Sequence, residues 1–145
     1  MVGKMKIDYS NMTPITFVLF LWQLPQCLIG LILYFMFKIE PIEYTNPHTN
    51  MNVLWIPTKW SACWSLGPFI FAHFDSGQEI LNHETGHSVQ SLYLGPLFLL
   101  AVGLPSIFLF WWRRLGNKSH EWYYDHYPES WANKLGGVSD IDSKE

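Results

Sequence analysis

The stretch Asp75-Ser-Gly-Gln-Glu-Ile-Leu-Asn-His-Glu-Thr-Gly-His87 decides the fold and the chemistry that we expect of this chain. Ser76 is followed three residues later by Glu79, which is the pattern of a capping box and predicts the start of a helix. On that helix His83 and His87 share a face, so both imidazoles can bind one Zn²⁺ ion. Glu84 lies beside them and can take a proton from water. The pattern H-E-x-x-H thus predicts a zinc site with Glu84 as its catalytic base.

Two histidines require a further protein ligand to make a zinc site. The residues near the motif or downstream of it that can serve are His73, Asp75, His120, Glu121, Asp125, His126 and Glu129. Spacing alone leaves the choice among them open.

Charged residues are scarce and unevenly placed. The chain has 145 residues, of which 49% are hydrophobic and 14% charged, with a net charge of −3. Soluble domains carry about 25% charged residues, and this composition excludes a disordered chain and a nucleic-acid binder with a basic face. No charge occurs from Pro14 to Phe37 or from Val89 to Trp112. Each run exceeds the about 20 residues of a bilayer-crossing helix, so we expect an integral membrane protein in contact with lipid.

The first uncharged run predicts a transmembrane helix over 14–37, after a polar N-terminus over 1–13. Pro25 predicts a kink in this helix. Gln23 and Gln26 require hydrogen-bond partners within the protein.

Two short segments rich in β-branched and aromatic residues, 52–56 and 66–74, are typical of strands and together predict a β-hairpin. Pro68 favours an edge position for the second strand. Edge strands pair with extended peptides, so the substrate is expected along Phe69, Ile70, Phe71 and Ala72. Pro128 before Glu129, and the glycines at 136 and 137, predict a short helix over 129–135.

A second motif, Glu129-Ser-Trp-Ala-Asn133, precedes Gly136. H-E-x-x-H followed by E-x-x-A-D before a glycine resembles the membrane-embedded gluzincin metallopeptidases, which include integral-membrane CAAX prenyl proteases and bacterial heat-shock membrane proteases. Over 73–137, the resemblance implies a Zn²⁺ cofactor with Glu129 as third ligand. Asn133 replaces the family's Asp and would hold a ring N–H of His83 or His87, with weaker support than a carboxylate gives.

Segments 90–96 and 102–106 are also similar to those of small bacterial membrane proteins with an H-E-x-G-H motif, a resemblance that implies no activity but places the chain in a bacterial inner membrane. Tyr123, Tyr124 and His126 are candidates for stabilising an oxyanion. The alternative is that these three are interfacial aromatic residues.

The proposed ligands constrain the second uncharged run. A continuous helix over 89–112 would rise about 36 Å, which crosses a bilayer and leaves Glu129 on the far side from the histidines. A return through 113–128 would carry several charges through lipid at high cost. The ligand set therefore predicts a broken membrane hairpin that turns near Gly103–Ser106, with Ser106 capping the returning leg.

The sequence as a whole predicts an α+β integral membrane protein. It would contain one transmembrane helix, a β-hairpin, the H-E-x-x-H helix running into the broken hairpin, and a C-terminal helix. Residues 38–137 would form a minimal zincin-like metallopeptidase domain that acts on peptide or protein substrates, followed by a polar tail over 138–145. The alternatives are a structural zinc site, a degenerate scaffold without activity, and a chance occurrence of the motif.

Overall fold

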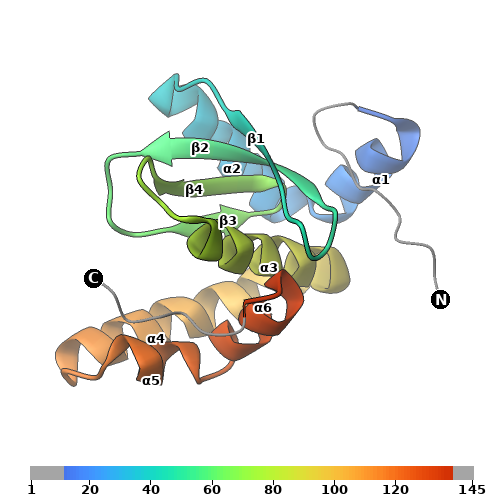
Figure 1. Cartoon of the computed structure of the whole chain (residues 1–145). Helices are drawn as coiled ribbons and strands as arrows, with labels where there is room; N and C mark the ends of the chain where they lie inside the picture. Colours follow the sequence, from blue (N-terminus) through green and yellow to red (C-terminus); the bar gives the residue numbers. More distant parts are fainter. Residues whose placement is uncertain (1–11, 139–145) are drawn as a thin grey trace.

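A four-stranded sheet forms the middle layer of the computed structural model, which describes residues 12–138 (Figure 1). The strands are β1 (Ile42–Thr45), β2 (Asn52–Thr58), β3 (Trp64–Leu66) and β4 (Phe69–His73). The α-helices are α1 (Pro14–Trp22), α2 (Leu24–Phe37), α3 (Gln78–Leu94), α4 (Leu104–Leu115), α5 (His120–Tyr124) and α6 (Glu129–Gly136). A 3₁₀ turn, η1 (Gly95–Leu97), and a π-helical turn, η2 (Leu99–Gly103), connect α3 to α4.

The strand order in the sheet is β1-β2-β4-β3. β1 and β2 form one antiparallel hairpin, and β3 and β4 form another. The central pair, β2 and β4, is parallel, with Leu54 opposite Phe69 and Thr58 opposite His73. β3 therefore forms one edge of the sheet and β1 the other.

The alternation of side chains along β4 creates two cores. Phe69 and Phe71 point to one face, where they pack with Ile56 against partly buried residues of α2. Ile70 and Ala72 point to the other face, where they pack with Val53 and with Leu81 of α3. The sheet thus lies between α2 and α3, and α6 packs against α3 (Figure 1).

The predicted transmembrane helix over 14–37 is wrong. The segment forms two helices, α1 and α2, that meet at an angle of 99°. Within residues 12–138 no single helix has the length and apolar character needed to cross a membrane, although this bent pair satisfies both criteria when its halves are taken together. The bend has a physical cause, because Pro25 lies in the first turn of α2 and has no N–H to continue a helix.

The expected partners of the two glutamines are present at the bend. Gln26 donates from Nε2 to Ser91 Oγ at 2.8 Å and to the Gly95 carbonyl at 2.9 Å. Ser91 in turn donates to Gln23 Oε1 at 2.6 Å. These bonds hold the α1–α2 junction on the C-terminal end of α3.

The predicted single hairpin over 52–56 and 66–74 is also wrong. The two segments correspond to β2 and β4, which are parallel neighbours, and each forms a hairpin with a short strand that the pattern did not reveal. Phe69, Ile70, Phe71 and Ala72 therefore belong to a central strand and not to an edge. Pro68 lies in the turn before β4, so its missing N–H leaves the strand's own pairing intact.

The predicted turn of the second uncharged run at Gly103–Ser106 does not occur. Gly103 has helical dihedral angles, and the chain continues from η2 into α4. The break lies earlier, at Gly95, whose φ of 52° is readily adopted only by glycine. The chain reverses after α4, and α5 then runs beside it (Figure 1). Ser106 is consequently an interior residue of α4 and not a cap.

The two helices that carry the motifs are close to their expected positions. The predicted helix over 129–135 is observed as α6. The H-E-x-x-H helix is α3, but its N-cap is Gly77, so the expected Ser76 capping box does not form.

Candidate metal centre

Two glycines bring α3 and α6 into backbone contact. A Cβ atom on Gly86 would overlap the carbonyl group of Ala132, and one on Gly136 would overlap the carbonyl group of Asn82. Only glycine permits so close an approach. Asn46 in the β1–β2 loop adds a hydrogen bond from Nδ2 to the Gly136 carbonyl at 3.0 Å. The first turn of α6 is thereby held over the face of α3 that carries the histidines.

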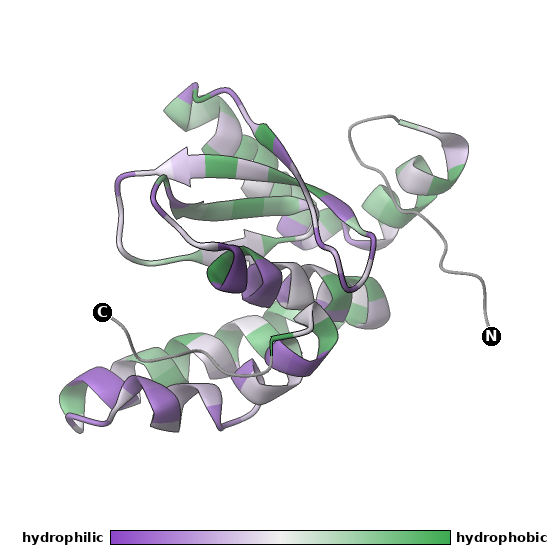
Figure 2. Cartoon of the chain, viewed as in Figure 1, coloured by the Kyte–Doolittle hydropathy of each residue, from purple (hydrophilic) through white to green (hydrophobic). Residues whose placement is uncertain are grey.

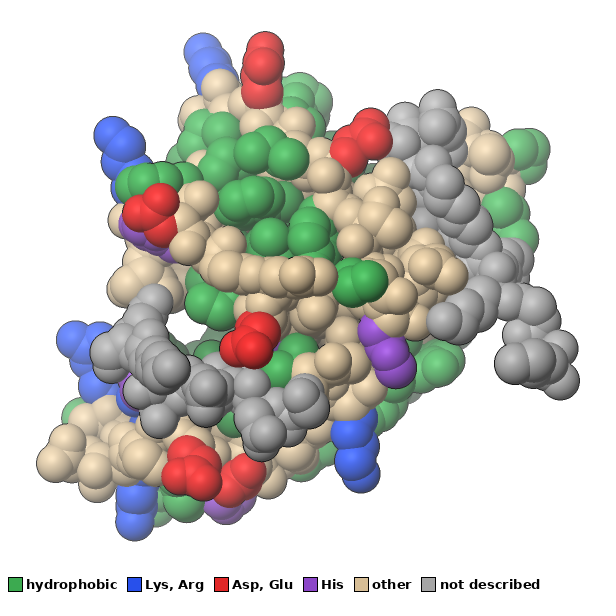
Figure 3. Space-filling model, viewed as in Figure 1, with side chains coloured by type: hydrophobic (Ala, Val, Ile, Leu, Met, Phe, Trp, Pro, Cys, Tyr) green, Lys and Arg blue, Asp and Glu red, His purple; other side chains and the backbone are tan. Residues whose placement is uncertain are grey.

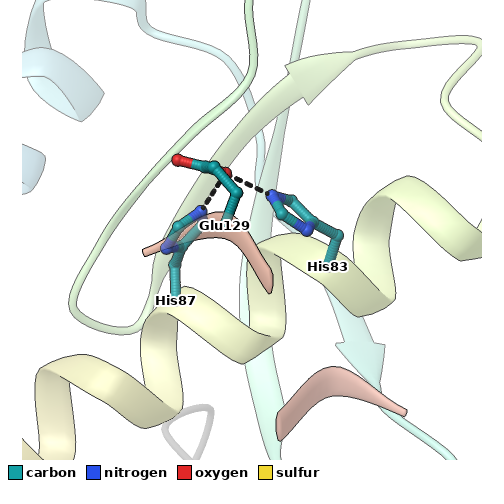
Figure 4. Close-up of side chains that lie close together, drawn as sticks. All are labelled: His83, His87 and Glu129. Carbon is teal, nitrogen blue, oxygen red and sulfur yellow. Dashed lines mark hydrogen bonds and ion pairs between the residues drawn. The ribbon is translucent and has the colours of Figure 1, made fainter. Parts of the chain in front are cut away.

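The side chains of His83, His87 and Glu129 converge between these helices (Figure 4). Glu129 Oε2 lies 3.0 Å from His83 Nε2 and 3.1 Å from His87 Nε2. The exposed fractions of the three residues are 3%, 8% and 1%. Their ligand atoms all lie within 4.8 Å of one another, so this buried group could bind a metal ion.

Each imidazole is oriented by a side-chain amide. The Nδ1 atom of His83 lies 2.6 Å from Asn133 Oδ1, and the Nδ1 atom of His87 lies 2.7 Å from Gln90 Oε1. Gln90 also donates from Nε2 to the Pro128 carbonyl at 2.9 Å, which fixes the orientation of its amide. An amide oxygen can only accept, so both rings donate from Nδ1–H.

This tautomer leaves an unprotonated Nε2 on each neutral ring, aimed at a carboxylate oxygen. Three hydrogen-bond acceptors then face one another in a buried site, and such an arrangement requires a cation among them. Either a proton or a metal ion fulfils that need. Two imidazole nitrogens and a carboxylate oxygen are the donor set of many three-ligand zinc sites, so the residues present fit the predicted metal.

The second oxygen of Glu129 is also held. Ser106 of α4 donates to Glu129 Oε1 at 2.6 Å, and Tyr123 of α5 lies close enough to Glu129 to interact with its charge. Burial and the charge of Glu129 raise the pKa of Tyr123 far above its usual value, so the phenol remains a neutral donor. The Glu129 carboxylate is therefore oriented by a hydroxyl group of α4 and bordered by a phenol of α5.

Glu84 is held by the edge strand. Ser65 of β3 lies with Oγ 2.7 Å from Glu84 Oε2 and 2.8 Å from the Glu84 carbonyl. Burial, followed by the charges of Glu84 and Glu129, raises the pKa of Tyr124, whose ring lies 5.0 Å from that of His83. The carboxylate of Glu84 and the hydroxyls of Tyr123 and Tyr124 thus border the same centre.

The metal-free centre carries a proton on His87 at neutral pH. Burial by itself lowers the pKa of His87, but Glu129 and then Glu84 and Gln90 outweigh burial and raise it from 6.5 to about 9. Burial would raise the pKa of Glu129, but His87 and His83 hold it well below its usual range. At neutral pH the metal-free site is therefore an imidazolium paired with a carboxylate.

This protonation makes metal binding depend on pH. Because zinc must displace the His87 proton, affinity should rise about tenfold per pH unit from about 6.5 to 9. Without metal, a raised folded-state pKa contributes stability that is fully present below 6.5 and is lost as the pH rises through about 9. Chelator competition at several pH values, with denaturant unfolding in EDTA, measures both effects. A zinc affinity that stays constant over this range would contradict the arrangement.

The other predicted site residues are distributed differently. His126 follows α5 and is exposed, with its Nδ1 atom 2.6 Å from the Trp122 carbonyl of that helix, and it does not join the centre. Among residues 12–138, the cluster contains none of the other candidate ligands, which are His73, Asp75, His120, Glu121 and Asp125. Phe69, Ile70, Phe71 and Ala72 are buried in the two cores of the sheet, the first and third facing α2 and the second and fourth facing α3.

Three residues of the centre were missed by sequence reasoning. Gln90 lies three residues after His87 and hence on the same helix face, a spacing that could have revealed it. Ser65 and Ser106 carry no local signal, because each is brought to the centre by an element remote in sequence.

Comparison with protein-family models, with curated proteins and with solved structures finds no match for this chain. The resemblance to the membrane-embedded gluzincins therefore depends on the two motifs alone. The structure by itself defines a small α+β domain with a buried His-His-Glu group that could bind a metal ion.

Proposed function

We propose that this chain is a zinc-dependent metallopeptidase. The observation that carries the proposal is the convergence of His83, His87 and Glu129, with both Nε2 atoms directed at one carboxylate oxygen where a metal ion can replace the proton. Glu84, adjacent to His83 in the sequence, adds the carboxylate that hydrolysis requires. The alternative donor pattern of a sulfur-rich structural site does not occur in this group.

Each group bordering the centre has a role in peptide hydrolysis. Zinc supplies a Lewis acid and lowers the pKa of water. Glu84 accepts a proton from the attacking water and returns it to the leaving amine, and Ser65 orients the carboxylate for this transfer. Tyr123 and Tyr124, kept neutral by their raised pKa values, can donate a hydrogen bond to the developing oxyanion.

Because β4 is a central strand, we assign substrate binding to β3, which forms the edge of the sheet on that side. An extended peptide adds to a sheet edge through main-chain hydrogen bonds. β3 lies at the edge of the sheet, and its Ser65 contacts Glu84. A peptide paired with β3 would therefore run beside the catalytic carboxylate.

Replacing Glu84 with glutamine tests the catalytic role. General acid–base catalysis contributes about 100- to 10,000-fold, so E84Q should lower peptide hydrolysis by that factor while zinc content is unchanged. Exposed Glu79 lies on the same helix, and E79Q is the matched control that should retain full activity. The measurement is cleavage of a fluorogenic peptide library by zinc-loaded chain. A wild type that cleaves no member, or an E84Q rate equal to the wild-type rate, would contradict the proposal.

A structural zinc site is the second candidate, and the burial of all three ligands favours it. Structural sites are closed, whereas catalytic sites keep one position for water or substrate. Binding of a small hydroxamate to the cobalt-substituted protein distinguishes the two, because only an open site changes its visible spectrum. An unchanged spectrum would show that the centre is a closed, structural site.

A further inference from the structure

Helix α4 exposes apolar side chains to an unusual degree. All of its residues are at least partly exposed, although most of them are hydrophobic. The exposed apolar residues recur at spacings of three and four, which places them along one face of the helix. We call this set the α4 ridge, and it consists of Leu104, Ile107, Phe108, Trp111, Trp112 and Leu115.

The opposite face of α4 contacts the rest of the protein. Ser106 contacts Glu129, and seven residues later Arg113 lies over the ring of Tyr123 at 6.0 Å. Residues seven apart lie on the same face of a helix. The α4 ridge therefore points away from the metal centre and from α5.

Helices α4 and α5 lie side by side as an arm beside the rest of the domain (Figure 1). Hydrophobic colour dominates α4, and hydrophilic colour dominates much of α5 (Figure 2). The face of the arm seen in Figure 3 carries acidic, basic and histidine side chains. The arm thus has a polar side formed by α5 and an apolar side formed by the α4 ridge.

We propose that the α4 ridge docks in the plane of a lipid bilayer surface, with α5 facing water. Trp111 and Trp112 are followed directly by Arg113 and Arg114, with Lys118 close behind. Aromatic side chains at headgroup depth beside basic residues are typical of helices that lie in the interface, especially on anionic lipids. This composition identifies lipid, rather than a second copy of the chain, as the partner.

An in-plane orientation follows from α5. If the arm crossed the bilayer, the exposed carboxylates of Glu121 and Asp125 would enter the hydrocarbon core beside α4, at high cost. Docking parallel to the surface avoids this cost, because only the ridge is buried. Ser106, on the face of α4 opposite the ridge, contacts Glu129, so docking places the metal centre one helix diameter (~10 Å) above the bilayer surface.

Spin labels on single cysteines test the docking directly. The full chain is labelled at Phe108 or Leu115 on the ridge, or at Glu121 or Asp125 on α5 as matched controls, in a Cys63→Ser background that retains buried Cys27. The samples are reconstituted into phosphatidylcholine vesicles containing phosphatidylglycerol. Collision rates with oxygen and with a neutral water-soluble relaxation agent then report the depth of each label.

We expect both ridge labels to shift into lipid at equal depth while both α5 labels stay in water. Ridge labels as accessible to water as the α5 labels would overturn the proposal. Depths that increase steadily along α4, or dipolar broadening from a second chain, would also overturn it. The lipid contact does not depend on the proposed hydrolysis, so zinc analysis of the same samples separates a failure of one from a failure of the other.

Discussion

Replacing Gly86 with alanine is expected to disrupt the packing of α3 against α6. The added methyl group would overlap the backbone carbonyl of Ala132, and a backbone atom cannot move aside by changing rotamer. Overpacking typically lowers the free energy of unfolding by about 1–3 kcal/mol. Because the overlap here is with a backbone atom, we expect a loss at or above the upper end of that range. The helices must separate, which removes Glu129 and Asn133 from the histidines. We therefore expect G86A to lose both thermal stability and zinc.

Gly103 supplies the matched control for this substitution. It lies in η2 with helical dihedral angles, and the nearest atom to an added Cβ would be 3.8 Å away. Alanine there is accommodated and restricts the unfolded chain, so G103A should be neutral or slightly stabilising. Thermal unfolding followed by circular dichroism compares the two variants. Equal melting temperatures for G86A and wild type would contradict the observed helix contact.

Glu129→Ala is expected to abolish stoichiometric zinc binding. The substitution removes the one carboxylate ligand and leaves two histidines, which are too few for a stable site. Loss of a supporting residue around a metal costs about 10- to 100-fold in affinity, so loss of a ligand should cost more. Metal content after dialysis, and chelator competition for the residual zinc, measure the effect.

Exposed Glu121 gives the control for this experiment, since it lies in the first turn of α5. E121A removes the same charge from the chain and should keep wild-type zinc content. Circular dichroism of E129A establishes that the helices persist without the ligand. Full zinc retention by folded E129A would show that Glu129 is not a ligand.

The sequence predicted the residues of the His-His-Glu group better than the architecture around them. His83, Glu84 and His87 were predictable because ligand spacing on a helix is a local property. Glu129 and Asn133 were found through a motif resemblance, and the structure places both beside the histidines. Their position is a consequence of Gly86 and Gly136, whose role in close helix packing has no signature in hydropathy.

The predicted topology was wrong where tertiary contacts override the local sequence pattern. Uncharged length indicated spanning helices, but Gln23 and Gln26 bind α3 and the chain bends between α1 and α2. The predicted turn at Gly103–Ser106 relied on glycine and proline, both of which also fit within a helix start. The actual break at Gly95 depends on a positive φ that composition does not reveal. The parallel pairing of β2 and β4 likewise depends on β3, a strand of three residues.

Zinc K-edge X-ray absorption of the purified full chain tests the central claim most directly. Two histidine nitrogens and a carboxylate oxygen from His83, His87 and Glu129 predict one zinc per chain with only nitrogen and oxygen neighbours at about 2.0–2.2 Å, including the imidazole scattering of two rings. Absence of stoichiometric zinc, or a sulfur shell at about 2.3 Å, would contradict the assignment of the metal centre to these residues.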